Sequence, residues 1–144
     1  MLSTVVVIVS ALALLGCSGS AARPPATQSA LTVADIDVGR SVATDKTIAD
    51  KTDTFRPGDT FYVAVKTVGS VGSAPTATLV AHWSYGDGQR INEATQTIAP
   101  SGPAVTEFHV SRPNGPGDGW PTGDYKVEIV LNGVSAGTEK FKVQ

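Results

Sequence analysis

Residues 125–131 read Tyr-Lys-Val-Glu-Ile-Val-Leu, and this segment decides the fold of the chain. Apolar side chains occupy every second position, with the charged residues Lys126 and Glu128 between them. This alternation is typical of a β-strand with one face buried and the other in water. Asn132-Gly133 follows and is a strong signal for a two-residue hairpin turn, so we expect a returning strand that ends at 140–143.

The same period of two recurs through most of the chain after residue 60. Four more segments alternate in this way: 61–66, 77–85, 90–98 and 107–111. Gly86-Asp87-Gly88 supplies a tight turn between two of them. Nearer the N-terminus, the apolar residues fall out of step between Val33 and Ile36, which predicts a β-bulge or two short strands. No segment after residue 30 has the apolar stripe of a helix.

The length and composition favour one small β-rich domain. A chain of 144 residues is one domain by the usual size range. With 41% hydrophobic and 17% charged residues, it is neither a disordered acidic tail nor a coiled coil. The 15 glycines and 9 prolines suit many short strands joined by turns. We therefore predict an all-β fold, a β-sandwich of about seven strands.

Charge and cysteine content exclude several classes of function. The 11 Lys and Arg residues nearly balance 13 Asp and Glu residues, giving a net charge of −2. This balance argues against nucleic acid as a partner. A single cysteine excludes an internal disulfide and a cysteine-rich metal site.

Two aromatic residues carry a resemblance to a known fold family. Trp83 lies in the middle of an apolar strand face, and Tyr125 follows Gly123 at the start of the next-to-last strand. Residues 31–144 thus resemble an immunoglobulin-like sandwich, which has a buried Trp on its third strand and a tyrosine corner at this point. Val127 stands where antibody domains have a cysteine, so the core must depend on packing.

Two turn segments extend this resemblance to the immunoglobulin-like accessory domains of bacteria. They are Phe55-Arg56-Pro57-Gly58-Asp59 and Trp120-Pro121-Thr122-Gly123-Asp124-Tyr125. In those domains a Pro-Gly turn precedes one strand and a Trp-Pro-x-Gly-x-Tyr corner precedes another. The resemblance implies a fold and an accessory role, and it carries no active site.

The N-terminal segment reads as a targeting signal. Residues 5–15 form a run of eleven residues without a charge, whereas a membrane-spanning helix needs about 20. The run has the length of the apolar region of a secretory signal peptide. It ends at Leu14-Leu15-Gly16-Cys17, which resembles the lipobox of bacterial lipoproteins and contains the only cysteine of the chain. The alternatives are an ordinary signal peptide or a buried helix that happens to contain a cysteine.

The lipobox resemblance implies a specific processing. Residues 1–16 would be a signal peptide cleaved between Gly16 and Cys17, after a diacylglycerol is attached to the Cys17 sulfur. Residues 17–30, which contain mostly small residues and a Pro24-Pro25 pair, would form a lipidated flexible tether to the domain at 31–144. Ser18 after the cysteine favours the periplasmic face of the outer membrane over the inner membrane, because Asp is the usual retention signal there.

No arrangement of residues predicts catalysis, a metal ion or another cofactor. His82 and His109 are the plausible bases, yet both fall on polar faces of predicted strands, and no Gly-x-Ser-x-Gly motif exists. A shared metal site would need further ligands. Three aspartates are better explained by turn chemistry than by calcium, namely Asp87, Asp118 and Asp124. Three glutamates read as isolated carboxylates on separate strands, namely Glu93, Glu107 and Glu128.

Residues 111–124 form a long Gly- and Pro-rich loop, the most informative stretch for binding. Loops at the ends of sandwiches often bind partners, and Trp is common in interface hot spots. The candidate contact residues of this loop are Trp120, Arg112, Asn114 and Asp118. The alternative is that Trp120 folds back and closes the end of the core. Further candidates elsewhere are Tyr62, Tyr85 and Arg90.

These observations predict a non-catalytic, lipid-anchored protein of the bacterial cell envelope. Its membrane contact would be the lipid on Cys17, and its immunoglobulin-like domain would act as a protein-binding or accessory module. A strand edge or a loop end would engage an envelope protein. Two alternatives stay open: an inhibitor of an envelope hydrolase that uses the loop at 111–124, and a structural spacer.

Overall fold

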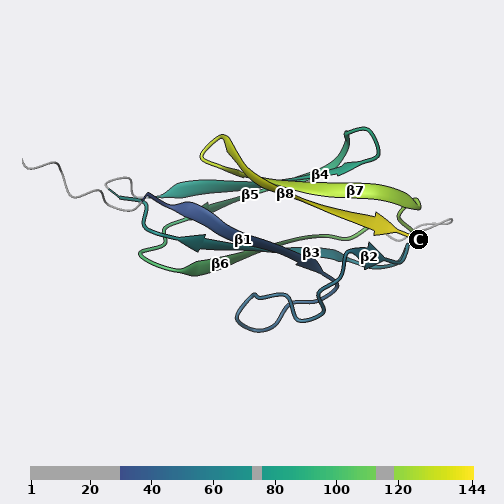
Figure 1. Cartoon of the computed structure of the whole chain (residues 1–144), viewed down its shortest axis with the longest axis horizontal. Coiled ribbons are helices and arrows are strands. Elements are labelled where there is room, and N and C mark those ends of the chain that lie inside the picture. Colours follow the sequence, from purple (N-terminus) through teal and green to yellow (C-terminus); the bar gives the residue numbers. More distant parts are fainter. Residues whose placement is uncertain (1–29, 73–75, 113–118) are drawn as a thin grey trace, which may run out of the picture.

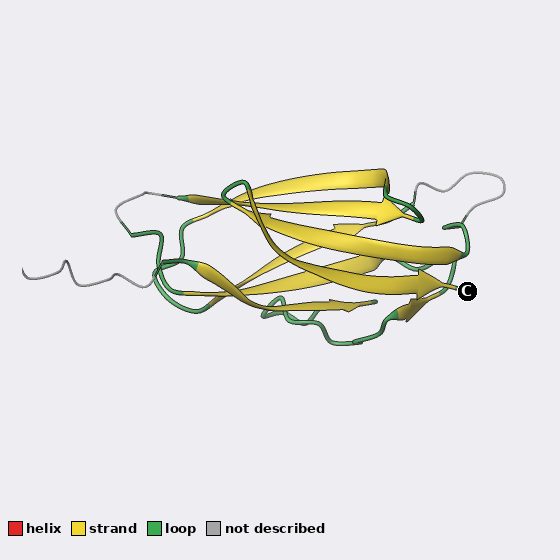
Figure 2. Cartoon of the chain, turned by 45° about the horizontal axis from the view of Figure 1, so that its top comes forward, coloured by secondary structure: helices red, strands yellow, loops and turns green. Residues whose placement is uncertain are grey.

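The computed structural model describes residues 30–72, 76–112 and 119–144, which form two β-sheets packed face to face (Figure 1, Figure 2). Eight strands follow along the chain: β1 (Thr32–Gly39), β2 (Thr54–Phe55), β3 (Phe61–Val68), β4 (Ala77–Tyr85), β5 (Gln89–Ile98), β6 (Ala104–Val110), β7 (Gly123–Leu131) and β8 (Val134–Val143). The smaller sheet has the order β1-β3-β6, and the larger has the order β2-β8-β7-β4-β5. The predicted all-β, immunoglobulin-like sandwich is confirmed, with one strand more than expected.

The chain crosses between the sheets three times after β3, from β3 to β4, from β5 to β6 and from β6 to β7. The described residues include no helix that is long and apolar enough to cross a bilayer. The segment at 1–16, expected to be a signal helix, lies outside the described residues, as does most of the tether at 17–30.

The β7–β8 hairpin forms at the predicted turn. Asn132 and Gly133 both have positive φ, 50° and 81°, as the preferred two-residue hairpin turn requires. The Asn132 side chain accepts a hydrogen bond from the backbone N–H of Thr78 at 2.9 Å. Its own backbone N–H donates to the Thr78 carbonyl at 2.8 Å. The turn is therefore fixed to β4 as well as to its own strands.

Bulges interrupt both strands that border one side of the sandwich. The pairing of β1 with β3 shifts between Val33 and Asp35, so the predicted bulge is confirmed. In β8, Gly137 pairs with Ile129 of β7, and Ser135 pairs with the next β7 residue, Val130. Ala136 is therefore an extra residue without a partner on β7. Bulges of this kind bend a strand and change the direction of its side chains.

The core is built from the apolar faces that the alternation predicts. Trp83 on β4 is fully buried and pairs with Val127 on β7, as the resemblance to immunoglobulin-like domains implies. The tyrosine corner is present too, because the Tyr125 hydroxyl donates to the Pro121 carbonyl at 2.7 Å. No disulfide is needed at this point, since Val63 and Val127 are fully buried on the facing sheets.

Aromatic side chains converge on Phe61, the first residue of β3. Its ring centroid lies 4.7 Å from that of Trp120, 4.8 Å from Phe141 and 4.9 Å from Phe55. The Tyr125 ring lies 5.5 Å away. These partners come from the larger sheet and from the segment before β7, so Phe61 connects the smaller sheet to both at this end of the molecule.

The strand that the sequence pattern missed is β2. Its two residues pair in parallel with the end of β8, Thr54 with Lys142 and Phe55 with Val143. Two residues are too few to show an alternating pattern, and the pairing depends on a distant strand. The expected Pro-Gly turn follows directly, closed by a hydrogen bond from the Asp59 N–H to the Arg56 carbonyl at 3.0 Å.

The segment between β1 and β3 is held against the smaller sheet by Arg40. The Arg40 guanidinium donates to the Asp59 carboxylate at 3.0 Å and to the Thr54 carbonyl at 2.8 Å. Gly39 leaves room for the segment, because a Cβ at this position would collide with the Asp50 carbonyl. These contacts connect β2 to the residue that directly follows β1.

Phe61→Ala should lower the free energy of unfolding by about 3–5 kcal/mol, because it removes a fully buried ring that contacts both sheets. Urea unfolding at neutral pH measures this change. Tyr62→Ala, one residue further along the same strand and half-buried, is the matched control, with an expected change below about 1.5 kcal/mol. Equal losses in the two variants would contradict the central role of Phe61.

Candidate functional site

In the structure, Trp120 lies in the core and not on the surface of the loop. Trp120 is only 8% exposed and its ring stacks on Phe61. The indole Nε1–H donates to the Asp59 carbonyl at 2.9 Å, and the backbone N–H donates to the Pro57 carbonyl at 2.7 Å. The alternative in which Trp120 closes the end of the core therefore describes this residue, and its indole is not free to contact a partner.

The other residues predicted at this loop are only partly described. Arg112 is exposed, donates to the Gly119 carbonyl, and places its guanidinium 6.0 Å from the centre of the Trp120 ring. Asn114 and Asp118 lie outside the described residues, as do Gly16 and Cys17.

The two histidines lie on different sheets. His82 belongs to β4 in the larger sheet, and His109 belongs to β6 in the smaller one. His109 is exposed, 2.7 Å from Glu107 through Nδ1, and near the ring of Tyr62. The strands β4 and β6 lie in different sheets and do not pair with each other.

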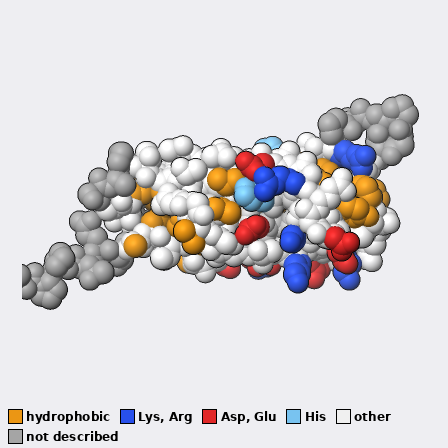
Figure 3. Space-filling model, turned by 90° about the horizontal axis from the view of Figure 1, so that it is seen from above, with side chains coloured by type: hydrophobic (Ala, Val, Ile, Leu, Met, Phe, Trp, Pro, Cys, Tyr) orange, Lys and Arg blue, Asp and Glu red, His pale blue; other side chains and the backbone are white. Residues whose placement is uncertain are grey.

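The glutamates of the larger sheet are not isolated, which corrects the expectation from the sequence. Glu93 on β5 and Glu128 on β7 stand on either side of His82, at 3.2 Å and 3.9 Å from its ring nitrogens. Arg90 donates to Glu93 at 2.5 Å. Figure 3 shows a histidine, in pale blue, among charged side chains near the middle of the face seen from above. The face is an open surface, and the cluster joins three strands by cross-strand pairs.

The described residues contain no group of three or more His, Cys, Asp or Glu side chains arranged to hold a metal ion. Asp87 is exposed in the turn between β4 and β5, where Gly86 and Gly88 both have positive φ. Asp124 lies at the start of β7, and Asp118 is outside the described part.

A second ionic cluster covers β1 of the smaller sheet. The Lys66 ammonium lies 2.8 Å from Asp35 and 3.0 Å from Asp37, and Lys51 also bonds Asp37. The Lys51 hydrogen bond, with help from Lys66, holds the pKa of the buried Asp37 carboxyl below its usual range. The hydrogen bonds of Lys66 to the Asp35 and Asp37 carboxylates raise the pKa of Lys66. This cluster fastens the segment after β1 onto the sheet.

On one side of the sandwich, the front side in Figure 1, β1 of the smaller sheet lies next to β8 of the larger sheet. Three cavities of about 380, 290 and 460 Å³ follow one another along it. The first and second share Val33 and Ala136, and the second and third share Ile36 and Glu139. They form one continuous groove, which we call the β1–β8 groove.

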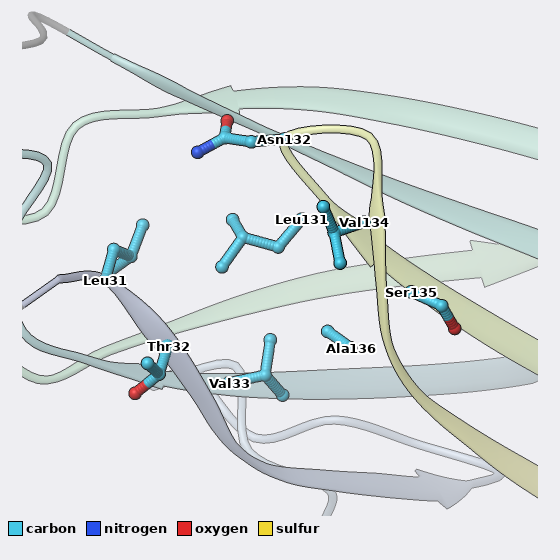
Figure 4. Close-up of a pocket in the computed structure, with 8 residues that line it drawn as sticks. All are labelled: Leu31, Thr32, Val33, Leu131, Asn132, Val134, Ser135 and Ala136. Carbon is cyan, nitrogen blue, oxygen red and sulfur yellow. The ribbon is translucent and has the colours of Figure 1, made fainter.

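The chemistry of the β1–β8 groove changes along its length. At the hairpin end the side chains of Leu31, Val33 and Leu131 point into the space between β1 and the hairpin (Figure 4). Val134 lines the same end and is 69% exposed, the most exposed large apolar residue of the described part. At the β2 end the lining is polar and charged: Asp35, Asp37, Lys51, Thr52, Asp53, Glu139 and Lys140.

On the opposite side of the sandwich, between β5 and β6, a side-chain hydrogen bond joins the two sheets. The Gln96 side chain on β5 donates to the Glu107 carbonyl on β6 at 2.6 Å. On the β1–β8 side the two sheets meet by packing, because the Ile36 side chain lies where a Cβ at Gly137 would be. The sequence did not predict the groove, because its position depends on which strands become the edges of the sheets. The available signal was the run of small residues at 135–137 directly after Val134.

Comparisons with solved structures show proteins that are similar to this chain in fold. The C-terminal domain of wzt has a TM-score of 0.51 at 11% identity, covering 79% of this chain and 73% of that one. An immunoglobulin-like protein from Pseudomonas aeruginosa has a TM-score of 0.49 at 15% identity, covering 82% and 99%. The alkylpurine DNA glycosylase AlkC of Pseudomonas fluorescens, bound to DNA containing an abasic site analog, has a TM-score of 0.49 at 9% identity.

The match to the glycosylase covers 76% of this chain but only 30% of that enzyme, so this chain spans less than a third of its length. At these identities the likeness concerns the fold alone. No protein-family model matches the sequence. No curated protein matches it either.

Asp37→Asn should flatten the acid side of the stability profile. The pKa of Asp37 is lower in the folded chain, so its charged form stabilises the fold above the unfolded pKa of about 4. This contribution is lost as the pH falls through the folded pKa. Urea unfolding between pH about 5 and 2 should show a smaller decrease in the variant. Asp87→Asn, in an exposed turn, should keep the wild-type slope; an unchanged slope in Asp37→Asn would contradict the expectation.

Proposed function

We propose that this chain is a non-catalytic, lipid-anchored protein of the bacterial cell envelope whose immunoglobulin-like domain is a protein-binding or accessory module. The open β1–β8 groove is the observation that carries the binding half of this proposal. Extended grooves beside a free strand edge suit polypeptide partners, because the backbone supplies hydrogen bonds and the walls supply apolar contact.

The lipid anchor rests on the lipobox at Leu14-Leu15-Gly16-Cys17. Two or three acyl chains on Cys17 would hold the protein at the membrane stably, whereas a single chain binds only marginally. The 13 residues from 18 to 30 would span at most about 45 Å when fully extended. The chain enters the domain at Leu31, at the hairpin end of the groove, so the groove would stay near the membrane surface.

A non-catalytic role agrees with the positions of the titratable groups. Enzyme sites are usually concave and hold their acid, base and nucleophile within hydrogen-bond reach of one substrate. His82, Glu93 and Glu128 instead form a row across the outer face of the larger sheet. The ionic groups near β1 are engaged with one another, Lys66 with Asp35 and Asp37.

The inhibitor alternative has lost its anchoring side chain, because Trp120 packs inside the core. The spacer alternative differs from the proposal in one measurable respect: a spacer has no specific partner at the groove.

Lipidation is tested by metabolic labelling with radioactive palmitate. The wild-type chain should incorporate the label and fractionate with membranes, while Cys17→Ala should do neither, because the thiol is the point of attachment. Ser18→Asp is the matched control and should keep the label while moving the protein from the outer to the inner membrane. Absence of label from the wild-type chain would rule out the lipid anchor.

Partner binding is tested by site-specific photo-crosslinking in living cells. A photoreactive residue at Ala136, in the groove, should give one discrete crosslinked product. The same photoreactive residue at Thr95, on the edge strand β5 at the other end of the larger sheet, should give no crosslinked product. Products of equal yield from both positions, or none from Ala136, would favour the spacer.

A further inference from the structure

The backbone of β8 has a free edge that faces the β1–β8 groove. The backbone N–H of Lys142 donates to the carbonyl of Asp53, just before β2, at 2.9 Å. The N–H of Gln144, just after β8, donates to the carbonyl of Phe55 in β2 at 3.0 Å. Backbone groups alternate in direction along a strand, so alternate residues of β8 point the same way. The N–H and C=O groups of Lys140 and Thr138 therefore point toward the same edge as those of Lys142.

That edge is occupied by β2 at its last residues only. The parallel pairing covers Lys142 and Val143, and β2 begins at Thr54. Within residues 30–72, 76–112 and 119–144, no strand pairs with Thr138 or Lys140 on this side. Unpaired strand edges are ready templates for another extended chain.

We infer that the β1–β8 groove binds an extended segment of a partner protein, which adds to the larger sheet as a strand beside β8 and in line with β2. This inference rests on the proposed function and names the binding surface and the kind of partner. The segment would use the free groups of Thr138 and Lys140 for main-chain hydrogen bonds.

The length of the edge limits the segment. From Val134 to Lys140 the strand has seven residues, or about 20–25 Å at the usual rise per residue. The partner segment therefore needs six or seven extended residues. The bulges in β1 and β8 both border the middle cavity, where Ala34 and Ala136 lie, and this cavity has the smallest volume of the three.

The walls specify the composition of the segment. The hairpin end offers Leu31, Val33 and Val134 to apolar side chains. At the β2 end, Glu139, Asp53 and Lys140 have no ion pair among the described residues, whereas Lys51 is engaged by Asp37, so the free charges are two negative and one positive. A segment that is apolar at the hairpin end and carries Lys or Arg at the β2 end fits both.

A single extended segment suits this groove better than the edge of a second folded copy. A copy that paired through its own β8 would bring its smaller sheet against β1 and the segment that follows β1. A flexible segment of a partner has no second layer to accommodate, and such recognition is common at exposed sheet edges.

The test uses the full chain and an array of random seven-residue peptides as the probe. Bound peptides should be enriched in alternating apolar residues at one end and Lys or Arg at the other. Thr138→Pro, which removes a free-edge N–H but no bond to β7, should weaken their binding at least about tenfold. Thr138→Ala, which keeps the N–H, should bind within about twofold of wild type.

A second variant covers the case in which Thr138→Pro does not fold. Glu139→Lys keeps the backbone and should reverse the preference from Lys or Arg to Asp or Glu at that end of the bound peptides. Hydrogen exchange at the Thr138 and Lys140 amides should be fast in the free protein and slow at least about tenfold with bound peptide. Slow exchange in the free protein would mean that another part of the chain already occupies the edge, and would overturn the inference.

The failures of the two proposals are distinguishable. The Thr138→Pro change can be combined with the photoreactive residue at Ala136. If the yield of crosslinked partner then equals that without Thr138→Pro, the proposed function stands and strand addition is overturned. Self-association of the chain that requires the Thr138 edge would replace the partner segment by a second copy. An array without binders, together with no crosslinked product, would overturn both.

Discussion

The packing around Phe61 is the constraint on which the rest of the structure depends. This ring begins β3 in the smaller sheet and contacts Phe141 in the larger sheet at 4.8 Å. It also stacks on Trp120 and meets Phe55 edge-on. A domain without a disulfide needs large apolar contacts between its layers, and a buried aromatic cluster supplies them where the two sheets and the segment before β7 meet.

The same cluster determines where a partner can bind. Phe55 packs against both Phe61 and Phe141, and these contacts help to hold β2 beside the last residues of β8. Because β2 is only two residues long, the remainder of the β8 edge is left beside the groove. Trp120 is drawn into the same cluster, so this end of the sandwich is closed by a residue that a loop-binding hypothesis would need at the surface.

Local patterns predicted much of the fold. The turn at Asn132-Gly133 and the bulge after Val33 were both predicted from neighbouring residues, because turn type and register depend on local backbone preferences. The tyrosine corner at Tyr125 was predicted from its resemblance to a known pattern, and its hydrogen bond spans only four residues. The row of Glu93, His82 and Glu128 was not predicted, since it depends on the register of three strands.

The sequence by itself determined an all-β chain with a two-residue hairpin at Asn132-Gly133, because side-chain alternation and turn preferences are properties of adjacent residues. Only the tertiary structure decided that Trp120 is a core residue and that the edge of β8 near Thr138 borders a groove. Both depend on contacts between residues far apart in the chain. Strand order and the packing of Phe61 decide these contacts, and no local pattern encodes either.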